Sequence, residues 1–164
     1  MFRNLIIIAF LFSSFASFGQ IEDVSIIKSS KNSINVKFGY GYYGPDLSYG
    51  LGFTYERQIY QFDNSFLLAR AGWTYWALWG GSANTYKLDL AYILGKKNSH
   101  LEFDLGMIIA TECNDSDEII CSSYEKFRLS ANIAYRYQKP GGRSIFRVGI
   151  GREALAFVSY GFAF

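Results

Sequence analysis

Residues 158–164, Val158-Ser159-Tyr160-Gly161-Phe162-Ala163-Phe164, alternate large apolar side chains at even positions with small ones at odd positions. Successive side chains of a β-strand point to opposite faces, so the stretch predicts a strand with one apolar face and one face of small residues. The aromatic rings repeat along the apolar face, as on strands whose outer face meets lipid. The last seven residues therefore predict a membrane-facing strand.

The same alternation recurs through most of the chain. Polar or glycine-containing connections separate eight such segments, at roughly 33–43, 47–59, 65–76, 85–95, 100–110, 126–137, 144–151 and 155–164. An outer-membrane strand needs about 9–11 residues, so eight strands and their connections use up this length. No apolar run after the N-terminal segment approaches a helical span. We predict an all-β fold, an eight-stranded antiparallel, up-and-down transmembrane β-barrel.

The N-terminal segment is typical of a cleaved secretory signal. Arg3 provides its positive start, Leu5 to Phe12 its apolar centre, and small residues lead to a cleavage site near Gly19. The tract is too short for a transmembrane helix. There is no cysteine near the cleavage site, which argues against a lipid anchor. We expect a signal peptide at 1–19, a periplasmic segment at 20–32 and a barrel at 33–164 in the bacterial outer membrane.

Splitting each segment into its two faces places the charges on one side. Between residues 100 and 110, for example, Leu101, Phe103 and Leu105 share a face, and Glu102 and Asp104 lie on the other. A soluble barrel would bury the apolar face and expose the charges, so a continuous apolar face with a charged opposite face predicts a polar interior. Ten charged side chains fall on this inner face: Lys37, Glu56, Arg70, Lys87, Asp89, Glu102, Asp104, Arg128, Arg136 and Arg147.

We interpret these ten residues as a charge-paired core, because side chains just fill the interior of an eight-stranded barrel. A selective pore lined by the same charges is the alternative. With the N-terminus on the periplasmic side, the polar connections at 95–99 and 139–142 become periplasmic turns. The connections at 76–86 and 111–125 become outer loops, and the turn at 44–46 is unusually short.

Sites of other kinds have little support in the sequence. Cys113 and Cys121 lie in the predicted 111–125 loop, where we expect a disulfide in an exported chain, although spacing alone does not show that the sulfurs meet. The acids of the same loop lack the spacing of an EF-hand, so a solvated loop is preferred to a calcium site. His100 is predicted to be interfacial or solvated at the periplasmic rim rather than catalytic. We expect no metal site and no cofactor.

The signal, the eight alternating segments, the charged interior and Phe164 together resemble the small eight-stranded outer-membrane barrels of the OmpA/OmpX-like type. The Gly19-Gln20 junction and the strands rich in Tyr and Phe are also similar to barrel proteins of Bacteroidota. The resemblance implies contact with outer-membrane lipid and lipopolysaccharide. It also implies insertion by the barrel-assembly machinery, with an assembly signal in Tyr160, Phe162 and Phe164. A peptidoglycan-binding domain such as that of full-length OmpA is not expected.

These patterns favour a non-enzymatic, monomeric outer-membrane protein that contributes to envelope integrity or to surface interaction through its outer loops. A porin-like narrow channel and a lipid-modifying enzyme are the functional alternatives, and a water-soluble lipocalin-like barrel is the structural one. Without Arg3, the other 15 of the 16 basic residues nearly balance the 14 acidic residues, so the charge offers no basis for nucleic-acid binding. The sequence identifies no surface ligand.

Overall fold

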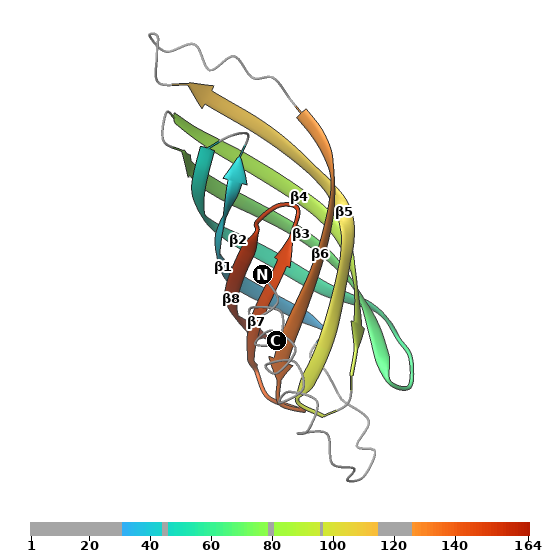
Figure 1. The fold of residues 1–164 in the computed structure, drawn as a ribbon. Helices are drawn as coiled ribbons and strands as arrows, with labels where there is room; N and C mark the ends of the chain where they lie inside the picture. Colours follow the sequence, from blue (N-terminus) through green and yellow to red (C-terminus); the bar gives the residue numbers. More distant parts are fainter. Residues whose placement is uncertain (1–30, 44–45, 79–80, 96, 115–125) are drawn as a thin grey trace, which may run out of the picture.

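The structure, a computed structural model, describes residues 31–43, 46–78, 81–95, 97–114 and 126–164. Strands account for most of this part of the chain (Figure 1): β1 (Asn32–Tyr43), β2 (Asp46–Gln61), β3 (Ser65–Leu78), β4 (Gly81–Leu94), β5 (Ser99–Asn114), β6 (Lys126–Gln138), β7 (Ser144–Gly151) and β8 (Ala156–Ala163). Among the described residues, no helix is long and apolar enough to cross a membrane.

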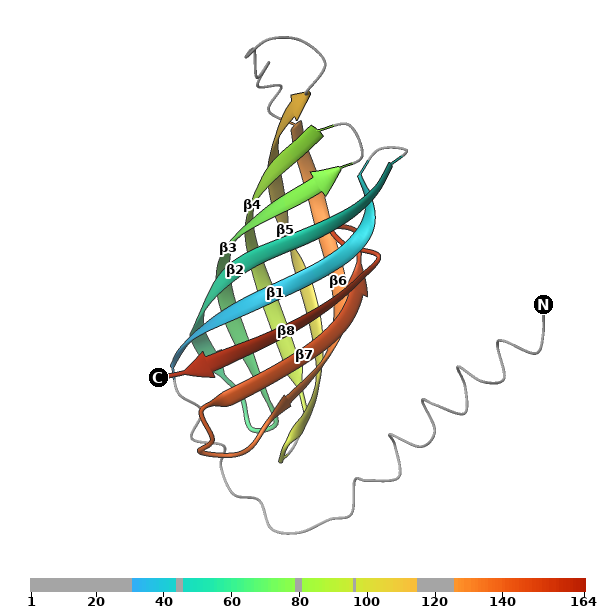
Figure 2. The same cartoon turned by 90° about the vertical axis from the view of Figure 1, so that its left-hand side faces the viewer.

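The strands form a closed antiparallel barrel in sequence order, β1 to β8, and β8 pairs with β1 to close it. Figure 2 shows the strands inclined to the barrel axis, as closure of a sheet requires. Two backbone hydrogen bonds join the start of β1 to the end of β8: Asn32 N to Phe164 O at 3.2 Å and Phe164 N to Asn32 O at 2.9 Å. The predicted eight-stranded, up-and-down fold is confirmed. We call this end of the barrel the terminal end and the opposite one the far end.

The wall is not equally high all round. Strands β2 to β5 have 14–16 residues, whereas β7 and β8 have only 8 each. The predicted outer loop at 76–86 is wrong, because β3 and β4 stay paired as far as Leu78 and Gly81. The predicted strands ended near residue 76 and resumed near residue 85, and polar residues such as Ser82 and Asn84 lie between them. Polar residues are compatible with a strand that continues past the apolar belt, so polarity alone did not mark the strand end.

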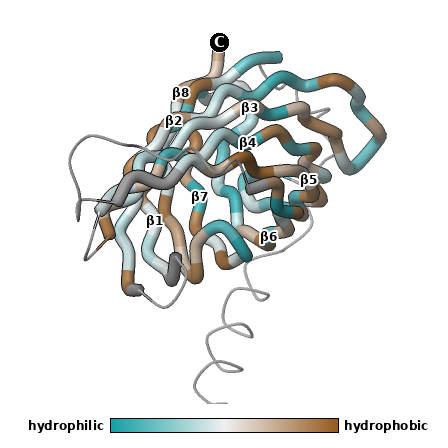
Figure 3. Tube along the Cα trace, turned by 90° about the horizontal axis from the view of Figure 1, so that it is seen from above, coloured by the Kyte–Doolittle hydropathy of each residue, from teal (hydrophilic) through white to brown (hydrophobic). Residues whose placement is uncertain are grey.

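Burial alternates along the strands as the two-face interpretation predicts. In β8 every second residue is buried, and Tyr160, Phe162 and Phe164 are 60%, 49% and 57% exposed on the outer face. Most exposed large apolar side chains follow this outward parity, including Leu88, Leu105 and many others. Figure 3 shows hydrophilic and hydrophobic residues mixed along the same strands. The outer face of the barrel is therefore the apolar one.

The ion-paired interior as candidate site

All ten charged residues that the sequence assigned to the inner face lie on inward-facing strand positions. Eight of them are buried, and Lys87 and Arg128 are partly exposed. Charged side chains are almost never buried unless they are paired, so their partners decide what the interior can do.

Arg70 of β3 is a main junction of the network. Its guanidinium contacts three carboxylates: Glu56 from Nε at 2.8 Å, Glu102 from Nη2 at 2.8 Å and Asp104 from Nη1 at 2.6 Å. Only 2% of its side-chain surface is exposed. A guanidinium presents its N–H groups in a rigid planar fork, which suits several acceptors around one centre. Arg70, on β3, therefore links a carboxylate of β2 to two carboxylates of β5.

Glu56 of β2 forms ion pairs with cations from the other side of the barrel. Its Oε2 lies 2.8 Å from Nη1 of Arg136 on β6, and its Oε1 lies 3.1 Å from Nη1 of Arg147 on β7. Ser33 donates a further hydrogen bond to Oε2 at 2.8 Å. Arg147 also pairs with Glu102. Because β2 and β6 lie four strands apart in an eight-stranded barrel, these contacts cross the interior.

A second group of charges lies nearer the far end. Lys37 Nζ contacts Glu153 Oε1 at 2.7 Å, and Lys87 pairs with Asp89 and lies 3.8 Å from both Asp104 and Glu153. Thr74 donates to Glu153 at 3.2 Å. Burial by itself raises the pKa of Glu153, but Lys37 and Lys87 together outweigh it and hold the pKa below its ordinary value.

Glu153 is the functional residue that the sequence analysis missed. It belongs to the short connection between β7 and β8, outside the predicted strand segments at 144–151 and 155–164, yet its side chain is only 5% exposed. One signal was present, because the ten predicted residues contain six cations and only four acids. An excess of buried cations implies a missing acid, and the low wall formed by β7 and β8 brings that acid into the barrel.

The charges in the described ion pairs balance. Arg70, Arg136, Arg147, Lys37 and Lys87 face Glu56, Glu102, Asp104, Asp89 and Glu153, five against five. Arg128 lies on the same inner face, opposite Ile108, which on its other side pairs with Lys87. A small cavity of about 20 Å³ lies among Lys37, Lys87 and Glu153, which is room for about one water molecule. Paired charges, rather than a wide aqueous space, occupy the middle of the barrel.

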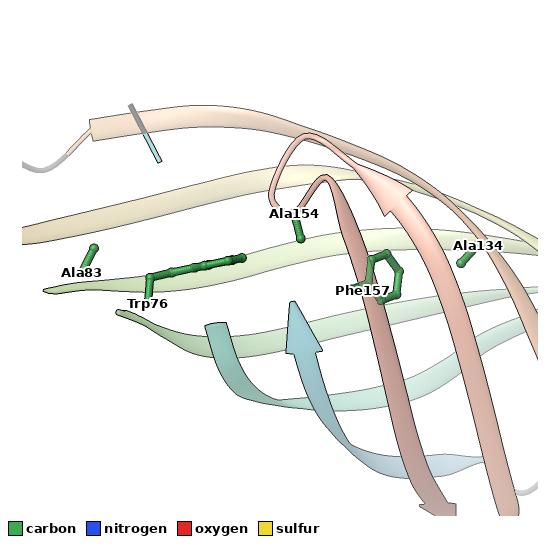
Figure 4. Close-up of a cluster of buried hydrophobic side chains, with 5 residues drawn as sticks. All are labelled: Trp76, Ala83, Ala134, Ala154 and Phe157. Carbon is green, nitrogen blue, oxygen red and sulfur yellow. The ribbon is translucent and has the colours of Figure 1, made fainter. Parts of the chain in front are cut away.

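Apolar side chains pack on both sides of the network. Toward the far end, Trp76 and Phe157 belong to a buried cluster with Ala83, Ala134 and Ala154 (Figure 4). The Trp76 indole donates to Thr85 Oγ1 at 3.1 Å. A Cβ on Gly50 would lie 2.7 Å from Cε3 of this indole, so the ring fits only because the facing residue is glycine. Toward the terminal end, Phe66, Leu68, Ala91 and Ile93 form a second cluster.

His100 is not interfacial or solvated, contrary to the sequence-based expectation. It is 3% exposed, lies on the inner face of β5 and meets the Phe66 ring edge-on, with ring centroids 5.9 Å apart. Its even position in the strand already placed it inward with Glu102 and Asp104, and the assignment to the rim ignored that parity. In the described part of the chain, no hydrogen bond links a serine hydroxyl to His100, as an acyl-transfer site would need.

Other predicted site residues are placed only in part. The side chain of Cys113 and all of Cys121 lie outside the described residues, so the disulfide stays a prediction. Tyr160, Phe162 and Phe164 share the outer face of β8 and its end, and Tyr160 donates a hydrogen bond to Ser144 Oγ at 3.1 Å. The assembly signal also stays a prediction. Among the described residues, no group of His, Cys, Asp and Glu is arranged to hold a metal ion.

Comparisons with known proteins identify the fold. No family model matches the chain, and no curated protein matches it in sequence. The solved structure of the outer membrane protein Ail from Yersinia pestis superposes with a TM-score of 0.52 and 13% identity, over 82% of this chain and 99% of Ail. The outer membrane enzyme PagL gives a TM-score of 0.45 and 13% identity, over 80% and 99%. The chain has the eight-stranded barrel fold of small outer-membrane proteins. Identity this low carries the fold and no activity.

Proposed function

We propose that this chain is a non-enzymatic integral protein of the bacterial outer membrane, exported by a cleaved signal. In this proposal its sealed barrel serves envelope integrity and anchors a surface-exposed end for interaction. The observation that carries the proposal is the neutral set of five cations and five acids that crosses the interior. An apolar outer face around a charge-paired core that side chains fill suits a barrel that lipid surrounds and solutes do not cross.

The unequal wall supports the part of the proposal that concerns the surface. A membrane crossing uses about 9–11 residues per strand, and β5 has 16, so about five residues, roughly 17 Å along the strand, remain. β4 stays paired with β5 as far as Gly81 and Asn114. With the terminal end in the periplasm, this paired ribbon rises above the outer surface and carries the connection at 115–125. Surface interaction would therefore use this side of the barrel.

A conductance measurement tests the sealed interior. The full chain, refolded into a planar lipid bilayer, should give no discrete current steps. Steps in the wild type that change in size when Arg70 is replaced by Gln would contradict the proposal and support a narrow channel lined by the same charges. Asp63→Asn, which neutralises an exposed acid on the β2–β3 turn, serves as the matched control and should leave the record unchanged.

A second measurement tests the absence of enzymatic activity. Mass spectra of lipid A from cells with and without the protein should be identical. A mass difference that disappears in His100→Ala would require an enzyme and would overturn the proposal. We do not expect it, because His100 is buried against Phe66 inside the barrel, where a lipid in the membrane does not reach it.

A further inference from the structure

Basic side chains gather at the terminal end of the barrel. Among the described residues, four exposed basic side chains lie there: Lys31 and Arg57 beside the start of β1, and Lys139 and Arg143 in the turn between β6 and β7. We call these four residues the basic arc. Asp63, on the β2–β3 turn, is the one exposed acidic side chain at this end in the part of the chain that the structure describes.

Backbone contacts show that the arc is continuous along the rim. At one end, Lys31 O accepts a hydrogen bond from Gln58 N at 2.8 Å, which sets Lys31 next to Arg57. At the other end, Gly142 N donates to Lys139 O at 2.8 Å, and Arg143 follows directly in the chain.

The last residues of the chain join these two halves. Arg143 O accepts from Ala163 N at 2.7 Å, and Phe164 is hydrogen-bonded to Asn32, the neighbour of Lys31. The arc therefore runs over the consecutive strands β7, β8, β1 and β2.

Within the described part of the chain, the arc differs from the interior in having no carboxylate side chain as an ion-pair partner. In the described ranges, Lys31, Arg57, Lys139 and Arg143 form no ion pair with a carboxylate, whereas five interior cations are paired. Arg143 instead lies over the ring of Phe162, with its Cζ 5.8 Å from the ring centroid. Four like charges on one rim repel one another, so an anion placed along the rim would stabilise them.

Exposed aromatic rings border the arc on its membrane side. Tyr55 and Phe146 are both 42% exposed on the outer face, and Phe162 and Phe164 are 49% and 57% exposed. Aromatic side chains of membrane proteins concentrate at the level of the lipid headgroups. Cations that lie beside such a belt are therefore at the depth of the phosphate groups.

We propose that the basic arc binds the phosphate headgroups of anionic phospholipids in the inner leaflet of the membrane. This inference rests on the proposed membrane insertion, with the terminal end in the periplasm. A basic residue near an anionic membrane surface gains about 1 kcal/mol, which corresponds to about a fivefold preference for each contact. Anionic lipid would thus be enriched along β7, β8, β1 and β2 and less along the other strands.

The test uses the full chain inserted into phosphatidylcholine vesicles and spin-labelled lipids that carry either a phosphatidylglycerol or a phosphatidylcholine headgroup. Electron paramagnetic resonance gives the relative association constant of the two labelled lipids with the barrel. Only the boundary lipids on the arc gain, so we expect an overall preference of about twofold for phosphatidylglycerol. Replacing all four arc residues by Gln should reduce it to unity, while Arg152→Gln, which removes an exposed cation at the far end, should leave it unchanged.

A salt titration of the wild type keeps the proposal testable if the fourfold variant does not fold. The preference should decline as sodium chloride rises, because salt screens exposed charges. An inserted wild type with equal association of both lipids, or with a preference that salt does not alter, would overturn the proposal. Binding of the protein to purified peptidoglycan that is lost in the fourfold variant, without any lipid preference, would assign the arc to the cell wall and also overturn it.

Insertion is measured first, as protection of the barrel from trypsin in the vesicles. A wild type that fails to insert contradicts the proposed membrane function. An inserted barrel without headgroup preference contradicts the lipid-binding arc alone.

Discussion

Neutralising Glu56 is the sharpest test of the paired interior. The carboxylate contacts Arg70, Arg136 and Arg147 at 2.8, 2.8 and 3.1 Å, and its side chain is 1% exposed. Glu56→Gln preserves the shape but replaces one acceptor oxygen by an amide that donates. In either orientation the amide N–H groups face a guanidinium, and the interior keeps one uncompensated positive charge.

The size of the effect follows from these contacts. A hydrogen bond to a charged group contributes about 1.5–3 kcal/mol, and breaking a buried ion pair by removing one partner costs about 3–5 kcal/mol. Glutamine retains part of the hydrogen bonding of Glu56. We therefore expect Glu56→Gln to lower the free energy of unfolding by about 3–5 kcal/mol.

Urea unfolding of the barrel in lipid vesicles, followed by tryptophan fluorescence, measures this free energy. Asp63→Asn removes an exposed acid and should change it by less than about 0.5 kcal/mol. Adding Arg147→Gln to Glu56→Gln restores neutrality, so the double variant should be more stable than the sum of the two single losses predicts, by about 1–3 kcal/mol.

A loss below about 1 kcal/mol for Glu56→Gln would refute the reasoning, because that is the value of an ion pair exposed to water. The interior would then be hydrated, and the sealed-barrel proposal would lose its main support. Additive effects of the two substitutions would show that Glu56 and Arg147 are not coupled.

Three further predictions concern other parts of the molecule. Gly50→Ala should destabilise the barrel by about 1–3 kcal/mol, because the added Cβ meets the buried Trp76 ring; an unchanged urea midpoint would show that the ring can move. The pKa of Glu153 is depressed in the folded barrel, so the ionised carboxylate contributes to the free energy of unfolding above the ordinary carboxyl pKa. This contribution is lost as the pH falls through the lower pKa of the folded state. Acidification from about pH 5 to about pH 3 should therefore reduce the stability gap between wild type and Glu153→Gln, and a constant gap would contradict this role. Deleting Phe164 should reduce insertion in cells more than it lowers the urea midpoint of refolded protein; unchanged insertion would remove its assembly role.

The strand count and the direction of most side chains could be predicted from the sequence. Alternation with a period of two is written locally in each strand, so Lys37, Arg70 and Glu102 could be assigned to the inner face without knowing their partners. The same rule applied to His100 gives the buried position that the structure shows. The expectation that His100 is solvated was wrong because it gave more weight to the position of His100 near the end of a strand than to its inward parity.

The partners of these side chains depended on the tertiary structure. That Glu56 meets arginines from β3, β6 and β7 follows from the register and closure of the whole sheet, which no single segment encodes. The heights of the strands were also misjudged at the far end, because polar residues such as Asn84 suit either a loop or a strand that has left the lipid.

The sequence by itself determined an eight-stranded barrel with an apolar outer face and a charged interior, because each strand carries its own two faces. Only the tertiary structure decided that the short β7–β8 connection brings Glu153 to Lys37 and that Trp76 fills the space left by Gly50. Both contacts join residues from different strands or turns across the barrel interior. Their geometry is fixed by how the sheet closes, and sequence alternation carries no record of that closure.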